Sequence, residues 1–134
     1  MTPDRPRHHE TSSRLHLVDG APAWRARHGN ALVRYTPTAR PDTAALLLSG
    51  EFDAETVGCL REALDAVRTP QIERVLLDLA GIGFGDSALV HALTDTRRRP
   101  EKHILLGPLT RQFSRVLDLT DSRRRLDIAF DDAA

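Results

Sequence analysis

The chain has 134 residues, a length that suits a single domain of about 100 residues with a tail. Its 19 lysines and arginines balance 19 aspartates and glutamates. With no net charge and only six Phe, Trp and Tyr side chains, the composition argues against a direct nucleic-acid partner. The single cysteine, Cys59, cannot form an internal disulfide, and no apolar N-terminal run suggests a signal peptide or a membrane span, so we expect a cytoplasmic protein without membrane insertion.

The first 30 residues are poor in large apolar side chains and contain several prolines, glycines, serines and histidines. Such a segment cannot bury enough surface to offset the entropy of ordering it. We therefore expect a flexible extension over residues 1–30 and a folded domain over residues 31–134. Trp24 is the exception, because a lone aromatic side chain either packs on the domain or waits for a partner. His8 and His9 lack a third ligand at a useful spacing and predict no metal site.

The domain is predicted to begin with two strands and a helix. Residues 31–36 and 44–49 are apolar strand candidates separated by a turn, which predicts an antiparallel hairpin. A helix over residues 54–67 follows, because apolar side chains recur there at helical spacing. Asp53 stands directly before it, in the position of an N-cap.

The rest of the chain alternates strands and helices. The unbroken apolar run in residues 74–79 predicts a central strand covered on both faces. A helix over residues 88–97 and a strand over 103–106 follow, then a helix opening at Gly107 and Pro108 and an edge strand over 126–130. The order ββαβαβαβ predicts an α/β fold with a mainly parallel central sheet, an N-terminal antiparallel hairpin and helices packed on the sheet.

Three consecutive arginines, residues 97–99, close the second predicted helix. Cations are favourable at the negative end of a helix dipole, so these side chains fit an ordinary solvated helix terminus. A docking patch is the alternative interpretation of the same run. The sequence leaves both open.

The segment Phe-Gly-Asp-Ser-Ala-Leu at residues 84–89 connects the central strand to the following helix. A hydroxyl at such a junction lies at the carboxyl edge of the sheet and at the positive end of a helix, where backbone N–H groups can receive an anion. Considered without its neighbours, Ser87 is an ordinary helix N-cap or first-turn serine. The flanking sequence therefore decides whether Ser87 carries a function.

Three segments, in the correct order, resemble the STAS domain of bacterial anti-sigma factor antagonists. Residues 46–53 resemble that family's strand followed by Gly, Glu, a hydrophobic residue and Asp. Residues 75–87 resemble its strand followed by Phe, one residue and Asp-Ser, and residues 115–120 are similar to the end of its third helix. The resemblance extends over residues 44–130.

The resemblance implies a STAS fold and a non-enzymatic partner switch that regulates transcription. The unphosphorylated protein would bind an anti-sigma factor that is also a serine kinase of the GHKL type, and phosphorylation of Ser87 would release it. Asp86 is then the acidic neighbour of the phosphoacceptor, and Asp53 belongs to the partner-facing acidic loop. Ala88 and Leu89 stand where the family usually has a second hydroxyl residue and glycine, and we place both in the partner-binding surface.

Two other functions use the same segment. A STAS adaptor subunit of a sensory or lipid-transport assembly would bind partners without phosphorylation, and Ala88 and Leu89 favour this alternative. GDSL-type esterases carry a similar Gly-Asp-Ser block, but a serine nucleophile needs an oriented histidine. The downstream histidines, His91 and His103, do not follow the pattern of that class, and we expect both at the surface or at a strand edge.

The sequence contains no Gly-rich phosphate loop, metal-ligand cluster or dinucleotide fingerprint, so we predict no cofactor. One acidic pair is conceivable as a metal or acid/base site. Asp53 and Asp86 both follow predicted strands, and they would form such a pair only if those strands end side by side. Spacing along the chain does not decide this.

Overall fold

The structure is a computed structural model that describes residues 13–18 and 20–129. Seven strands form one mixed sheet in sequence order, from β1 to β7. The strands are β1 (Ser13–Val18), β2 (Ala21–Ala26), β3 (Leu32–Pro37), β4 (Thr43–Phe52), β5 (Arg74–Gly85), β6 (Lys102–Leu106) and β7 (Ile128–Ala129). The helices are α1 (Gly58–Val67), α2 (Ser87–Asp95) and α3 (Arg111–Leu119), with the short 3₁₀ helices η2 (Thr96–Arg98) and η3 (Arg123–Arg125).

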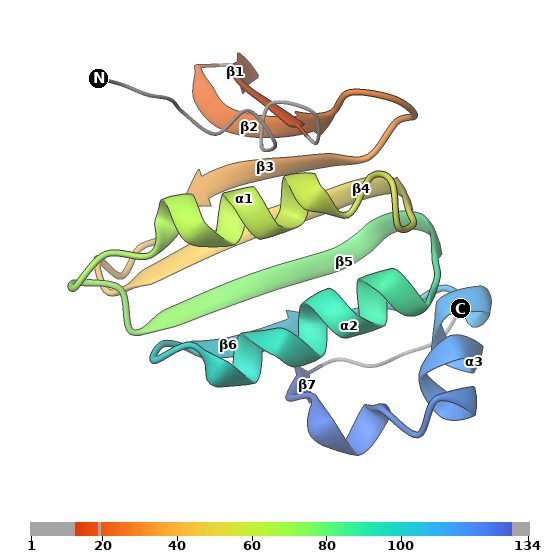
Figure 1. Cartoon of the computed structure of the whole chain (residues 1–134). Helices are drawn as coiled ribbons and strands as arrows, with labels where there is room; N and C mark the ends of the chain where they lie inside the picture. Colours follow the sequence, from red (N-terminus) through yellow and green to blue (C-terminus); the bar gives the residue numbers. More distant parts are fainter. Residues whose placement is uncertain (1–12, 19, 130–134) are drawn as a thin grey trace, which may run out of the picture.

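The sheet divides into an antiparallel part and a parallel part. Strands β1 to β4 pair antiparallel, and β4 to β7 pair parallel. Figure 1 shows α1 and α2 on one face of the sheet, with α3 beside the end of β5. The predicted α/β class and the predicted order from the hairpin onward are therefore confirmed. No helix in the described part of the chain is both long and apolar enough to span a membrane.

The N-terminal side of the sheet differs from the prediction. Residues 13–18 and 21–26 form β1 and β2 rather than part of a flexible extension. The side chain of Trp24 lies opposite Val33 of β3 and is only 6% exposed, so the alternative in which it packs on the domain is confirmed. Pairing with β3 provides hydrogen-bond partners for the backbone N–H and C=O groups of β2. The small apolar residues of β2, however, are weak predictors of a strand. His8 and His9 lie outside the described residues.

Two helices begin later than predicted, and strands β4 and β5 extend well past their predicted ends. Helix α1 starts at Gly58 because the residues before it form a hydrogen-bonded turn. Helix α3 starts at Arg111, since the Thr110 hydroxyl accepts a hydrogen bond from the Phe113 amide at 3.1 Å and caps the helix there. Strand β4 continues past residue 49 to Phe52, and β5 continues past residue 79 to Gly85.

One buried cluster fills the space between the sheet and its helices. Alternate side chains of β4 and β5 contribute to it, as expected for strands whose side chains alternate between two faces. Its largest fully buried side chains include Phe52, Leu46, Leu77, Leu60, Leu64 and Phe113. Cys59 is a free, buried thiol in this cluster, and burial raises its pKa to about 12.

The burial of Trp24 predicts that β2 is an integral part of the folded domain. Trp24→Ala should lower the free energy of unfolding by about 3–5 kcal/mol, because a large buried side chain is lost and a cavity remains. Urea denaturation of the full chain measures this change. Arg25→Ala, at the exposed neighbouring position of the same strand, is the control and should change the value by less than about 0.5 kcal/mol. Equal values for the two variants would contradict the placement of β2.

Candidate functional site

The ends of β4 and β5 bring the two predicted acidic residues to one edge of the sheet. Phe52 and Gly85 are register partners in these parallel strands, and Asp53 and Asp86 follow them directly. The Asp86 amide also donates a hydrogen bond to the Phe52 carbonyl at 3.2 Å. The sequence left this point open, and the structure shows that the two strands do end side by side, with both carboxylates at the same edge.

The Asp53 carboxylate holds the turn between β4 and α1. Its Oδ1 accepts hydrogen bonds from the amides of Glu55 at 2.9 Å and Thr56 at 3.1 Å. The buried hydroxyl of Thr56 accepts from the Asp53 amide at 2.9 Å and donates to the Glu51 carbonyl at 3.1 Å. Asp53 therefore caps this turn and not α1 itself, whose N-cap position is Val57. Thr56 was not predicted as a site residue from the sequence.

Asp86, not Ser87, caps helix α2. The Asp86 Oδ1 accepts a hydrogen bond from the Ala88 amide at 2.8 Å, and Ser87 is the first residue of the helix. The Ser87 side chain is exposed, and within the described residues no hydrogen bond or ion pair engages its hydroxyl. Of the two ordinary positions considered for Ser87, the N-cap is therefore wrong and the first turn of the helix is confirmed. Its hydroxyl is accessible from solvent.

Gly85 fixes the position of this junction. The Gly85 amide donates to Gln112 Oε1 at 3.0 Å, and Gln112 Nε2 donates to the Gly85 carbonyl at 2.7 Å. A Cβ at Gly85 would lie 2.6 Å from Leu89 Cδ2 and 2.8 Å from Phe113 Cδ1, so only glycine permits this approach of α2 and α3 to β5. Gln112 has no local sequence signal, because its role depends on a partner 27 positions away.

The structure corrects one residue of the predicted partner-binding set. Leu89 is 0% exposed and packs in the core, so it cannot contact a partner while α2 keeps this position. Ala88 is half-buried against the same core, and Asp53 and Asp86 are partly exposed. Phe84, at 37% exposure, adds an apolar side chain near the end of β5. The accessible part of the edge therefore includes Ser87, the carboxylates of Asp53 and Asp86, and the ring of Phe84.

The two downstream histidines lie in different environments. His91 is exposed on α2, whereas His103 is only 8% exposed on β6. The expectation that His103 lies at the surface is wrong, because its side chain is buried. Its strand pairs there with β5 through Val75, whereas β7 pairs only with Leu105 and Leu106. Across residues 13–18 and 20–129, no three His, Cys, Asp or Glu side chains are grouped to hold a metal ion.

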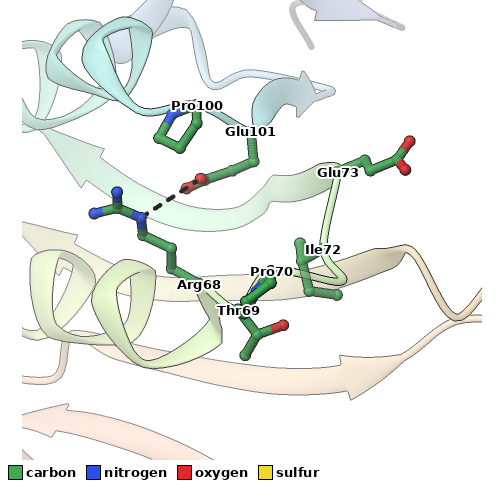
Figure 2. A pocket seen from close by; sticks show the side chains of 7 residues that line it. All are labelled: Arg68, Thr69, Pro70, Ile72, Glu73, Pro100 and Glu101. Carbon is green, nitrogen blue, oxygen red and sulfur yellow. Dashed lines mark ion pairs between the residues drawn. The ribbon is translucent and has the colours of Figure 1, made fainter.

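A pocket of about 450 Å³ opens where the parallel strands begin, beside the C-terminal end of α1. Figure 2 shows Arg68 directed toward Glu101, and Arg68 Nε lies 4.0 Å from Glu101 Oε1. The other carboxylate oxygen of Glu101 lies 3.3 Å from His103 Nε2, and both of these side chains are at most 3% exposed. The buried Glu101 side chain thus has Arg68 as its cationic neighbour and the His103 ring beside it, at the sheet edge opposite Ser87.

The geometry can be compared with known proteins. A family model described as "Mlab, STAS domain" matches residues 36–126. An anti-sigma factor antagonist from Mycobacterium paratuberculosis has a similar crystal structure, with a TM-score of 0.58, 19% identity, and coverage of 74% of this chain and 86% of that chain. The anti-sigma factor antagonist SpoIIAA in its unphosphorylated form gives a TM-score of 0.59 and 17% identity over 75% of this chain and 90% of that chain. No curated protein matches the chain in sequence.

The hydrogen bonds at α2 predict different roles in stability for neighbouring residues. Asp86→Ala removes the cap and should lower the free energy of unfolding by about 0.5–2 kcal/mol. Ser87→Ala should change it by less than about 0.5 kcal/mol, because the hydroxyl has no described partner. Thermal or urea denaturation of the two variants measures both values. A larger loss for Ser87→Ala than for Asp86→Ala would contradict the assignment of the cap.

Proposed function

The chain belongs to the STAS domain family, and from this premise we propose that it is a non-enzymatic, cytoplasmic anti-sigma factor antagonist that regulates transcription by binding and releasing a protein partner. The observation that carries the proposal is the free, exposed hydroxyl of Ser87 beside Asp86 at the edge of the sheet. The fold shared with two anti-sigma factor antagonists supports it. The proposed partner-facing residues are Ser87, Asp86, Asp53 and Ala88.

The partner in this proposal is an anti-sigma factor that is also a serine kinase of the GHKL type. It binds the neutral form of the site and transfers the γ-phosphoryl group of ATP to Ser87 Oγ. ADP leaves, and the hydroxyl proton passes to a base of the kinase. Binding frees a sigma factor, and phosphorylation ends that binding.

Electrostatics supports release on phosphorylation. A phosphoryl group adds about −1.5 to −2 charges at Ser87, beside the carboxylates of Asp86 and Asp53 on the same edge. A partner surface matched to the neutral hydroxyl would meet repulsion from this charge and would have to desolvate it. In the free protein, the positive end of α2 partly stabilises the phosphate. Affinity would therefore fall while the fold is kept.

A second candidate function is a STAS adaptor subunit of a sensory or lipid-transport assembly that is not phosphorylated. Ala88 favours it, because this position lacks the hydroxyl usual after the phosphoacceptor in switch proteins. Leu89, which is buried, stands in place of the usual glycine, and this departure from the switch pattern also favours the adaptor. Phosphorylation of Ser87 distinguishes the two candidates.

The proposal predicts one phosphorylation site. Intact-protein mass spectrometry after co-expression with the GHKL-type serine kinases of the source organism should show a single added phosphate. Ser87→Ala should not acquire it, because the acceptor oxygen is gone. The absence of phosphate with every such kinase would favour the adaptor function, and a phosphate retained in Ser87→Ala would place the acceptor elsewhere.

The proposal also predicts that charge at Ser87, not side-chain size, controls partner binding. Ser87→Asp should weaken binding to the anti-sigma factor by about tenfold or more, because it adds a like charge at the interface. The asparagine of Ser87→Asn has nearly the same shape as the aspartate of Ser87→Asp but carries no charge. Ser87→Asn is therefore the matched control and should bind more like Ser87→Ala. Titration calorimetry measures the three affinities. Equal affinities for Ser87→Asp and Ser87→Asn would contradict the electrostatic switch.

A further inference from the structure

A basic pocket of about 330 Å³ lies at the far end of α2 from Ser87. Helix α2 has nine residues, which at 1.5 Å per residue separate its two ends by about 13 Å. The pocket is formed between η2, β6 and the segment that begins with η3. It therefore belongs neither to the phosphorylation site nor to the partner-facing edge proposed above.

The pocket brings together two arginine runs that are distant in the sequence. Arg97 comes from the run of residues 97–99 at the end of α2, and Arg124 and Arg125 come from the run of residues 123–125. Parallel pairing of Leu105 with Ile128 places the chain after η3 beside β6. Of residues 97–99, only Arg97 lines this pocket, and Arg99 Nη2 lies 2.6 Å from Asp65 Oδ1. The structure therefore supports a binding role for Arg97 and not for the whole run.

The positive charge of the pocket is only partly balanced from within the protein. Arg97 is exposed and has no ion pair or hydrogen bond among the described residues. Arg125 Nη2 donates to Ser122 Oγ at 3.3 Å, and Arg124 pairs with the exposed Asp121 at 2.8 Å. The one carboxylate in the lining, Asp127, lies 3.6 Å from Lys102 Nζ. Guanidinium donors therefore remain free to bind an anion.

A buried imidazole gives the pocket a second, independent sign of a ligand. The side chain of His103 is 3% exposed and lines the pocket. Neither ring nitrogen has a hydrogen-bond partner among the described residues, although Nε2 lies 3.3 Å from Glu101 Oε2. Buried polar groups normally have partners. Burial lowers the pKa of His103, so the neutral ring carries one N–H donor that an oxyanion can accept.

From these observations we infer that the pocket between η2, β6 and η3 binds a small phosphate group, either free or in a small phosphate ester. Guanidinium forks recognise phosphate through paired hydrogen bonds. A tetrahedral phosphate offers oxygens to donors on several sides, as Arg97, Arg125 and His103 do here, whereas a carboxylate presents two oxygens in one plane. The size of the pocket suits a single phosphate group with a small substituent.

Titration of the full chain with inorganic phosphate, followed by NMR, tests the inference. Saturable binding should shift the His103 ring resonances, because that imidazole lies at the site. Arg97→Gln should weaken binding by about tenfold, since a charge-assisted hydrogen bond is lost. Arg98→Gln is the matched control, because Arg98 belongs to the same 3₁₀ helix but does not line the pocket. It should leave the affinity unchanged.

A second experiment distinguishes a lipid headgroup from a soluble phosphate as the source of the phosphate group. Vesicles containing phosphatidylglycerol present the group as a lipid headgroup, and inorganic phosphate should displace the chain from them if both use this pocket. Binding to phosphate alone would indicate a free phosphate or a soluble ester. The inference is overturned if neither probe binds saturably, if His103 does not shift, or if Arg97→Gln and Arg98→Gln weaken binding equally.

Discussion

The close approach of the ends of β4 and β5 is the constraint on which the candidate site depends. The register pair Phe52 and Gly85 sets two loops side by side, and Gln112 bonds both backbone groups of Gly85. The missing side chain of Gly85 lets Leu89 and Phe113 pack directly onto the strand. Backbone groups, core packing and the capping carboxylates of Asp53 and Asp86 hold this edge. The exposed hydroxyl of Ser87 does not take part in these contacts, so it is available for recognition.

A regulatory modification requires that folding and recognition use different atoms, and the N-terminus of α2 meets this requirement. If Ser87 were the cap, phosphorylation would alter the acceptor that holds the first turn, and a change in stability would accompany every change in binding. The carboxylate of Asp86 caps the helix instead. The hydroxyl of Ser87 can then change its charge while the backbone of the helix keeps its partners.

The sequence was informative where burial produces long apolar runs, and less so where structure depends on single contacts. Strands β4 and β5 were predictable from their continuous hydrophobic character, whereas the small residues of β2 gave little signal and Gln112 gave none. Leu89 was misassigned because closeness in sequence does not fix the face of a helix. Two residues turn an α-helix by about 200°, so an exposed Ser87 directs Leu89 into the core.

Net charge describes the chain as a whole and not its local fields. Balanced totals argue against an extended polyanion partner, and yet the fold gathers Arg97, Arg124 and Arg125 around one pocket. The two interpretations of residues 97–99 are also compatible, because a guanidinium near the C-terminal end of α2 benefits from the helix dipole while its remaining donors face outward. The dipole itself opposes an anion at this end of the helix. Any affinity of this pocket for an anion must therefore come from its side chains. Its selectivity is then a property of the arginines and His103 and not of the shared backbone fold.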